Sequence, residues 1–101
     1  MRKAKPKAAA APPAAWETVV TPRCLADIRQ WVETDRMLSL RLLTLLDVVG
    51  RDPFTGIGKP EPLVGLGSGF WSRRINQEHR LVYRIENRRV TFLAARYHYE
   101  K

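Results

Sequence analysis

Hydrophobic residues in the first half of the chain recur with the 3.6-residue period of an α-helix. In the first of two such stretches, the positions expected on the buried face are Leu25, Ile28, Trp31 and Val32. Thr21 and Pro22 precede this stretch, and a hydroxyl followed by proline is typical of a helix start. The pattern therefore predicts a first helix that begins at Thr21-Pro22 and runs to about Glu33.

A second periodic stretch begins almost at once, after Thr34 and Asp35. Its apolar positions form a wide stripe made of Leu38, Leu42, Leu45, Leu46 and Val49. Gly50 follows and is expected to end the helix, because glycine is common just past a helix end. Two helices joined by almost no linker predict a helical hairpin that packs its apolar faces on a sheet.

Four short runs are rich in the β-branched and aromatic residues that favour strands. These runs are residues 16–20, 70–75, 79–86 and 90–97. The polar segments between the last three are short, so an antiparallel meander is expected. The predicted order is β-α-α-β-β-β, an α+β domain with an antiparallel sheet packed by an N-terminal helical hairpin.

The 101 residues are expected to contain one folded domain, residues 16–101. Residues 1–15 are alanine, proline and basic residues after the initial methionine, which predicts a flexible basic arm. Residues 51–67 are rich in glycine and proline and are interpreted as a loop. Cys24 is the only cysteine and is expected to be a small buried residue of the first helix. No stretch approaches the roughly 20 apolar residues of a membrane span, and a cytoplasmic location is expected.

Basic residues outnumber acidic residues by 18 to 10, which gives a net charge of +8. The excess is uneven, with +4 over residues 1–15, −1 over residues 16–50 and +5 over residues 51–101. A positive field on the arm and on the second half indicates an anionic partner, most often a nucleic acid. A basic surface that only keeps the protein soluble is the alternative that charge alone leaves open.

The register of the predicted hairpins decides whether the basic residues meet. If residues 76–78 and residues 87–89 each form a three-residue loop, four cationic side chains share one sheet face. They are Arg74, Arg80, Arg96 and His98. A slip of one residue would scatter them over both faces. Like charges directly opposite one another are destabilising, so such a patch makes sense mainly if an anion binds to it.

These residue types are sufficient to cut RNA by attack of the ribose 2′-hydroxyl, which needs a base, a charge stabiliser and an acid. Glu61, in the glycine- and proline-rich loop, is the candidate base, and Arg80 is the candidate stabiliser. His98 is the candidate acid, because imidazole titrates near neutrality. Tyr99 can stack on a base or assist proton transfer. No cofactor or metal is required, and the cysteine and histidine content offers no zinc spacing.

Each of these residues also has a structural interpretation when it is taken alone. Glu61 can be an exposed loop acid, and His98 can be a surface histidine. Arg73 and Arg74 can be the solvated edge of the sheet. The joint pattern, more than any single residue, favours a functional site.

The sequence resembles the Txe/YoeB toxins of the RelE superfamily over about residues 16–99. The segments that carry the resemblance are Trp31-Val32-Glu33-Thr34-Asp35, Asp52-Pro53-Phe54, Gly58-Lys59-Pro60-Glu61-Pro62-Leu63, Ser68-Gly69-Phe70-Trp71-Ser72-Arg73-Arg74-Ile75, Glu78-His79-Arg80-Leu81-Val82-Tyr83 and Arg96-Tyr97-His98-Tyr99. The resemblance implies a RelE-like fold and a bacterial toxin that cleaves mRNA in the ribosomal A site. The residues that it implies to be catalytic are Glu61, Arg80, His98 and Tyr99, and the residues expected to bind RNA are Lys59, Arg73, Arg74 and Arg96.

The same resemblance implies three partners: mRNA on the 70S ribosome, a cognate YefM-like antitoxin, and a second copy of the chain in a homodimer. Two other functions remain open at this point. A non-catalytic module of the same fold would inhibit its target by occupying it. A general RNA-binding domain would bind in a salt-dependent way without cleavage.

Overall fold

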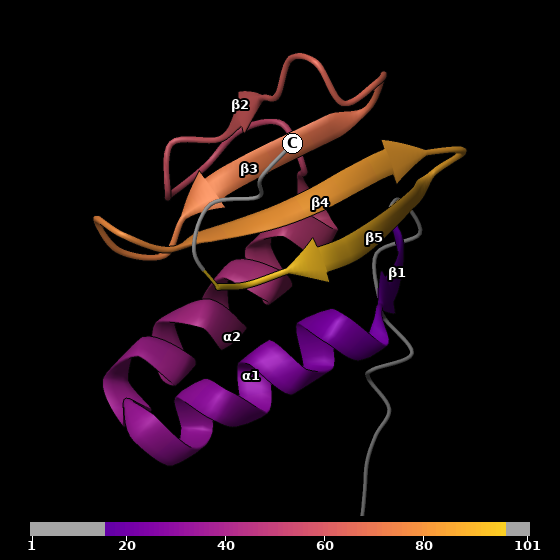
Figure 1. The fold of residues 1–101 in the computed structure, drawn as a ribbon. Helices are drawn as coiled ribbons and strands as arrows, with labels where there is room; N and C mark the ends of the chain where they lie inside the picture. Colours follow the sequence, from indigo (N-terminus) through magenta and orange to yellow (C-terminus); the bar gives the residue numbers. More distant parts are fainter. Residues whose placement is uncertain (1–15, 97–101) are drawn as a thin grey trace, which may run out of the picture.

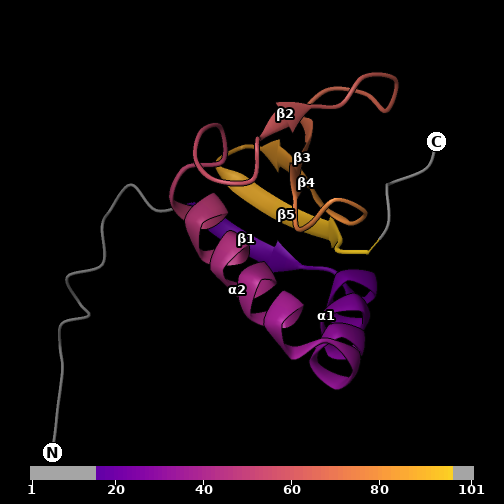
Figure 2. The ribbon, with the colours of Figure 1, turned by 90° about the vertical axis from the view of Figure 1, so that its left-hand side faces the viewer.

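The computed structural model describes residues 16–96, in which two helices cover one face of a five-stranded sheet (Figure 1). Figure 2 shows both helices on the same side of the sheet. The elements, in chain order, are β1 (Glu17–Val20), α1 (Pro22–Thr34), α2 (Arg36–Arg51), β2 (Glu61–Pro62), β3 (Phe70–Arg74), β4 (Arg80–Glu86) and β5 (Arg89–Ala94). The α+β class and the order of the predicted elements are confirmed. The predicted arm, residues 1–15, lies outside the described residues.

Side-chain caps fix the starts of both helices. The Thr21 hydroxyl accepts a hydrogen bond from the Cys24 N–H at 3.1 Å, and Asp35 Oδ1 accepts one from the Leu38 N–H at 3.1 Å. Each bond satisfies a backbone donor that has no partner inside its helix. Helix α2 continues through Gly50 to Arg51, one residue past the stop that was expected.

The apolar stripe of α2 forms the centre of the core, as predicted. Leu42, Leu45 and Val49 have no exposed surface and belong to the same buried cluster as Tyr83 and Phe92 of the sheet. Burying side chains of this size is the main favourable term in the folding of a small domain. Helix α2 is therefore held by packing along its whole length.

The buried face predicted for α1 was wrong in two of its four positions. Leu25 and Val32 are 51% and 57% exposed, whereas Cys24 and Asp27 are buried. The helix is turned so that Asp27 and Trp31 bond to the chain just after β5, and these polar contacts decide which face points inward. The apolar period alone gave no sign of them.

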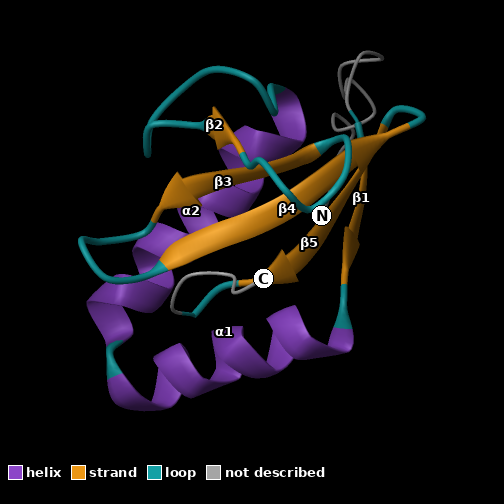
Figure 3. Cartoon of the chain, turned by 45° about the horizontal axis from the view of Figure 1, so that its top comes forward, coloured by secondary structure: helices purple, strands orange, loops and turns teal. Residues whose placement is uncertain are grey.

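The sheet has the order β1-β5-β4-β3-β2 and is mixed, not purely antiparallel (Figure 3). Strand β1 runs parallel to β5 at one edge, and the other three neighbouring pairs are antiparallel. Strand β2 lies within the segment that was interpreted as loop. Its two residues, one of them proline, are too short a run to give a strand pattern.

The first hairpin has the register that the sequence predicted. Arg74 pairs with Arg80, and the Ile75 N–H donates to the His79 carbonyl at 2.8 Å. The second hairpin differs, because its loop is only Asn87 and Arg88, both at positive φ. Such a two-residue loop matches the twist of antiparallel strands.

An irregularity in β5 compensates for the shorter second loop. Glu86 pairs with Arg89, but the register shifts by one residue between Val82 and Tyr83, so that Val82 pairs with Ala94. Beyond this bulge the strands follow the register that a three-residue loop would have set. Strand β5 ends at Ala94, so this register extends over a single pair, and the expected pairing of Arg80 with Arg96 lies beyond the end of the strand.

No helix in the described part of the chain is long and apolar enough to cross a lipid bilayer.

Two leucines of α2 provide a test of this packing. We expect Leu42→Ala to lower the free energy of unfolding by about 2–5 kcal/mol, because it leaves a cavity in the core. The matched change Leu40→Ala, at a position that is 44% exposed, should cost less than about 1 kcal/mol. Urea denaturation measures both values, and equal losses would contradict the orientation of α2.

Candidate functional site

The face of the sheet turned away from the helices, here called the open face, holds a carboxylate in contact with a guanidinium. Arg80 Nη2 lies 3.1 Å from Glu61 Oε2, and Arg80 Nε donates to the Ser72 hydroxyl at 2.9 Å. Glu61 pairs with Ser72 across β2 and β3, so three strands supply this contact. The Arg80 side chain is 14% exposed and the Glu61 side chain 58%, which leaves the carboxylate accessible.

Strand alternation determines which side chains reach the open face. Side chains two residues apart on a strand share a face, so Phe70 and Arg74 lie on the same side as Ser72. Arg74 is exposed and pairs directly with Arg80. Two arginines opposite each other repel, and Glu61 is the acid that offsets part of this charge. The site is thus a cationic patch with one carboxylate at its edge.

Arg73 was expected to bind RNA, but the structure places it in the interior. It follows Ser72 directly and therefore points to the helix side, where its side chain is fully buried. Its Nε donates to the Tyr83 hydroxyl at 3.1 Å, and its Nη1 donates to the Ile57 carbonyl at 3.1 Å. Its guanidinium is thus enclosed by protein, which corrects the prediction for this residue.

The remaining contacts of Arg73 hold the loop that leads to Glu61. Arg73 Nη2 donates to the carbonyls of Asp52 and Thr55 at 2.6 and 2.9 Å. Gly56 is at positive φ, and a Cβ there would lie 2.9 Å from Arg73 Nη1. The loop therefore wraps closely around the guanidinium, and glycine is needed for the approach.

Two further side chains fasten the same loop. The Tyr83 hydroxyl donates to the Pro53 carbonyl at 2.8 Å. Burial raises the pKa of Tyr83, and the hydrogen bond from Arg73 opposes that rise. The Thr55 hydroxyl and the Phe54 N–H donate to the Asp52 carboxylate and lower the pKa of Asp52. The loop is thus built from satisfied polar groups.

Lys59 and Arg96 were also expected to bind RNA, and the structure places them in different surroundings. Lys59 is exposed, with φ at 53°, and comes two residues before Glu61. Arg96 is half-buried, and its guanidinium carbon lies 6.0 Å from the centre of the Trp31 ring. Their role in RNA binding, like that of Arg74, stays a prediction.

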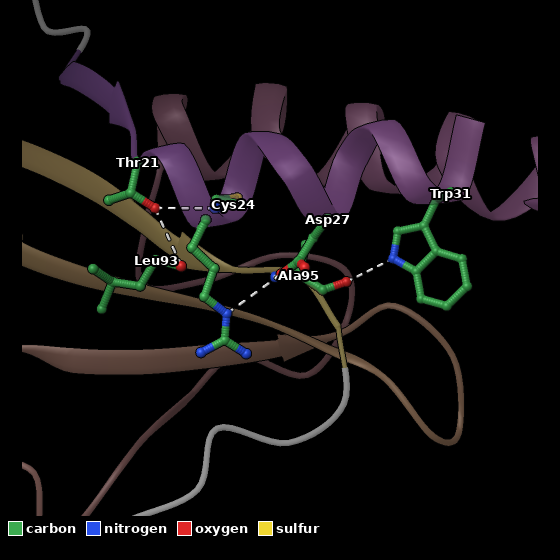
Figure 4. A network of polar contacts seen from close by, with 7 residues as sticks. Thr21, Cys24, Asp27, Trp31, Leu93 and Ala95 are labelled. Carbon is green, nitrogen blue, oxygen red and sulfur yellow. Dashed lines mark hydrogen bonds and ion pairs between the residues drawn. The ribbon is translucent and has the colours of Figure 1, made fainter. Parts of the chain in front are cut away.

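Helix α1 fixes the backbone just before Arg96 (Figure 4). The Ala95 N–H donates to Asp27 Oδ2 at 2.9 Å, and Trp31 Nε1 donates to the Ala95 carbonyl at 2.8 Å. The Thr21 hydroxyl adds a bond to the Leu93 carbonyl at 3.2 Å. An acid four residues before a tryptophan was the only sequence signal for this anchor, and it was missed.

His98 and Tyr99, the expected acid and its neighbour, lie outside the described residues. Ser72, which orients Arg80, was not singled out in the sequence because a lone serine in a strand carries little signal. Cys24 is buried as expected, and burial raises the pKa of its thiol to about 12. Within residues 16–96, no group of three or more histidine, cysteine, aspartate or glutamate residues could hold a metal ion.

Residues 20–99 match a family model described as the YoeB-like toxin of bacterial type II toxin-antitoxin systems. Toxin RelK of Mycobacterium tuberculosis is 52% identical over 87 residues, which cover 86% of this chain and 92% of that protein. Toxin YoeB of Escherichia coli K12 is 48% identical over 73 residues, which cover 72% of this chain and 87% of that protein.

Solved structures with the same fold include a YoeB/ParE toxin from Agrobacterium tumefaciens. Its TM-score is 0.74 at 40% identity, over 82% of this chain and 99% of that one. A YoeB dimer from Staphylococcus aureus gives a TM-score of 0.75 at 32% identity, over 84% and 99% of the two chains. A heterotetrameric YoeB–YefM complex from Staphylococcus aureus gives 0.71 at 33% identity, over 83% and 98%.

Substitutions at the neighbouring residues Arg73 and Arg74 test whether Arg73 has the structural role described above. We expect Arg73→Lys to lower the free energy of unfolding by roughly 3 kcal/mol, because an ammonium cannot reach the same set of acceptors in a buried site. Arg74→Lys, one residue away but exposed, should change it by less than about 0.5 kcal/mol. Chemical denaturation supplies the numbers, and hydrogen exchange should show faster exchange of residues 54–58 in the first variant alone.

Proposed function

The chain belongs to the family of YoeB-like toxins of bacterial type II toxin-antitoxin systems, and on that basis we propose that it is a ribosome-dependent mRNA endonuclease. The observation that supports this most directly is the contact of Glu61 with Arg80 on the open face. A base and a charge stabiliser for the same phosphodiester must lie within a few ångströms of each other. The 3.1 Å separation of these two groups meets that need.

Each residue has one task in the proposed reaction. The Glu61 carboxylate removes the proton of the ribose 2′-hydroxyl, whose oxygen then attacks the adjacent phosphorus. Arg80, oriented by Ser72, stabilises the negative charge that develops on the phosphoryl oxygens. His98 protonates the departing 5′-oxygen, and Tyr99 assists. Arg74 binds the phosphate next to the one that reacts.

The proposed step needs the Glu61–Arg80 contact to open when RNA binds. The phosphate then takes the place of the carboxylate at the Arg80 guanidinium, and the carboxylate turns to the 2′-hydroxyl. Because Glu61 is more than half exposed, this rotation displaces no packed side chain. A partly hydrated ion pair of this kind holds its partners weakly.

The proposed partners are mRNA on the ribosome, a YefM-like antitoxin and a second copy of the chain. The last two rest on similarity to the dimer and the heterotetrameric complex from Staphylococcus aureus. Arginines on the open face make an acidic segment a suitable occupant for an inhibitor.

The experiment maps the 5′ ends of mRNA on translating ribosomes after addition of the purified protein. The unaltered chain should give discrete cuts at the A site, and Glu61→Gln and His98→Ala should each slow cleavage by at least roughly 100-fold. The matched control is Glu17→Gln, which removes another carboxylate that lies 3.1 Å from an arginine but sits on the edge strand β1. That variant should cut at the original rate.

Other outcomes would count against the proposal in distinct ways. Cleavage by the Glu61→Gln variant at the rate of the unaltered chain would show that Glu61 is not the base. Message that is protected but intact would indicate a non-catalytic module that acts by occupancy. Free RNA cut as efficiently as translated RNA would contradict the dependence on the ribosome.

A further inference from the structure

We propose that Phe70 and Arg84 form a base-stacking subsite on the open face, which receives the nucleobase next to the phosphate held by Arg80. The inference rests on the proposed function, because it assigns an additional contact to the same RNA strand. Neither residue takes part in the catalytic set or in the cationic patch around Arg74.

The first support is position. Phe70 and Arg84 pair across β3 and β4, two residues along each strand from the pair of Ser72 and Val82. They therefore form the next pair on the same face. Side chains two residues apart on a strand point the same way, so Phe70 shares the open face with Ser72. Two residues of a strand span about 7 Å. This spacing is comparable to one nucleotide of an extended single strand.

The second support is the direction in which Arg80 reaches. Its Nε bonds to the Ser72 hydroxyl, so its guanidinium lies over the strand that carries Phe70. A phosphate bound by Arg80 is thereby brought to the same strand as the Phe70 ring. Val82, the side chain between the two arginines of β4 on this face, is small and almost completely covered. No bulky side chain of β4 separates the two groups.

The third support is chemistry. The Arg84 guanidinium carbon lies 5.2 Å from the centre of the Phe70 ring. Arg84 Nη1 forms an ion pair with Glu86 Oε1 at 3.1 Å. The Phe70 ring is outside the buried core cluster, and the Arg84 side chain is 44% exposed. Flat aromatic and guanidinium groups are the surfaces on which proteins stack unpaired bases. Here the two are already assembled beside a phosphate site.

The arrangement divides the open face into two functions along the strand direction. Arg74 and Arg80 supply charge for phosphates at one end, and Phe70 with Arg84 supplies a flat surface for a base at the other. Stacking tolerates every base but favours purines through their larger area. The subsite therefore adds binding energy at one defined codon position.

The test is a binding cycle between protein and RNA that needs no cleavage. The full chain carrying His98→Ala is titrated onto ribosomes programmed with mRNA in which each A-site codon position in turn is abasic. With Phe70 present, one position should show about tenfold weaker binding when its base is missing. In a chain that also carries Phe70→Leu, that penalty should disappear, whereas Phe70→Trp should retain it.

The control is Phe54→Leu, which changes a phenylalanine that is 44% exposed and packs near Trp16 and Trp71, away from the open face. It should leave the penalty in place. The same penalty with and without the Phe70 ring, or no penalty at any position, would overturn the inference. Failure of the unaltered chain to cut mRNA would instead overturn the proposed function, because this binding cycle does not use the reaction.

Discussion

The geometry of the site depends on the hydrogen bonds that the buried guanidinium of Arg73 makes to the loop before β2. A charge taken out of water is costly unless hydrogen bonds satisfy it, and here three backbone carbonyls and a phenol do so. Because the carbonyls belong to residues 52–57, the cation draws a loop of irregular conformation into one shape. That loop leads directly to β2 and so sets where Glu61 enters the sheet.

Strand β3 shows how one short sequence serves both structure and chemistry. Arg73 and Arg74 are identical residues in adjacent positions, and alternation sends the first into the interior and the second to the solvent. Ser72 then holds Arg80 from β4, and the pairing with β2 brings Glu61 to the same place. A shift of one residue in the pairing of β3 would turn Arg73 to the solvent and Arg74 to the interior. The same register is therefore required for the fold and for the site.

The sequence was a good guide where a local rule decides the outcome. The caps at Thr21 and Asp35, the stripe of α2 and the pairing of Arg74 with Arg80 follow from such rules. The failures involve long-range polar contacts: Asp27 and Trp31 turn α1 toward Ala95, and Arg73 serves a loop instead of RNA. Strand β2 and the bulge in β5 depend on neighbours that no local pattern encodes. Glu61 and Arg80 were expected to act in one site, and the structure brings their side chains into direct contact. His98 and Tyr99 lie outside the described residues, so their expected roles stay predictions.

The parallel pairing of β1 with β5 affects the order in which the molecule can assemble. Glu17 and Arg89, which pair across these strands, are 72 positions apart, and Asp27 finds its backbone partner 68 positions later. Segments synthesised earlier are therefore completed by segments synthesised much later, and long-range pairing of this kind slows folding. During translation the helical hairpin therefore has no finished sheet to cover until β5 has emerged.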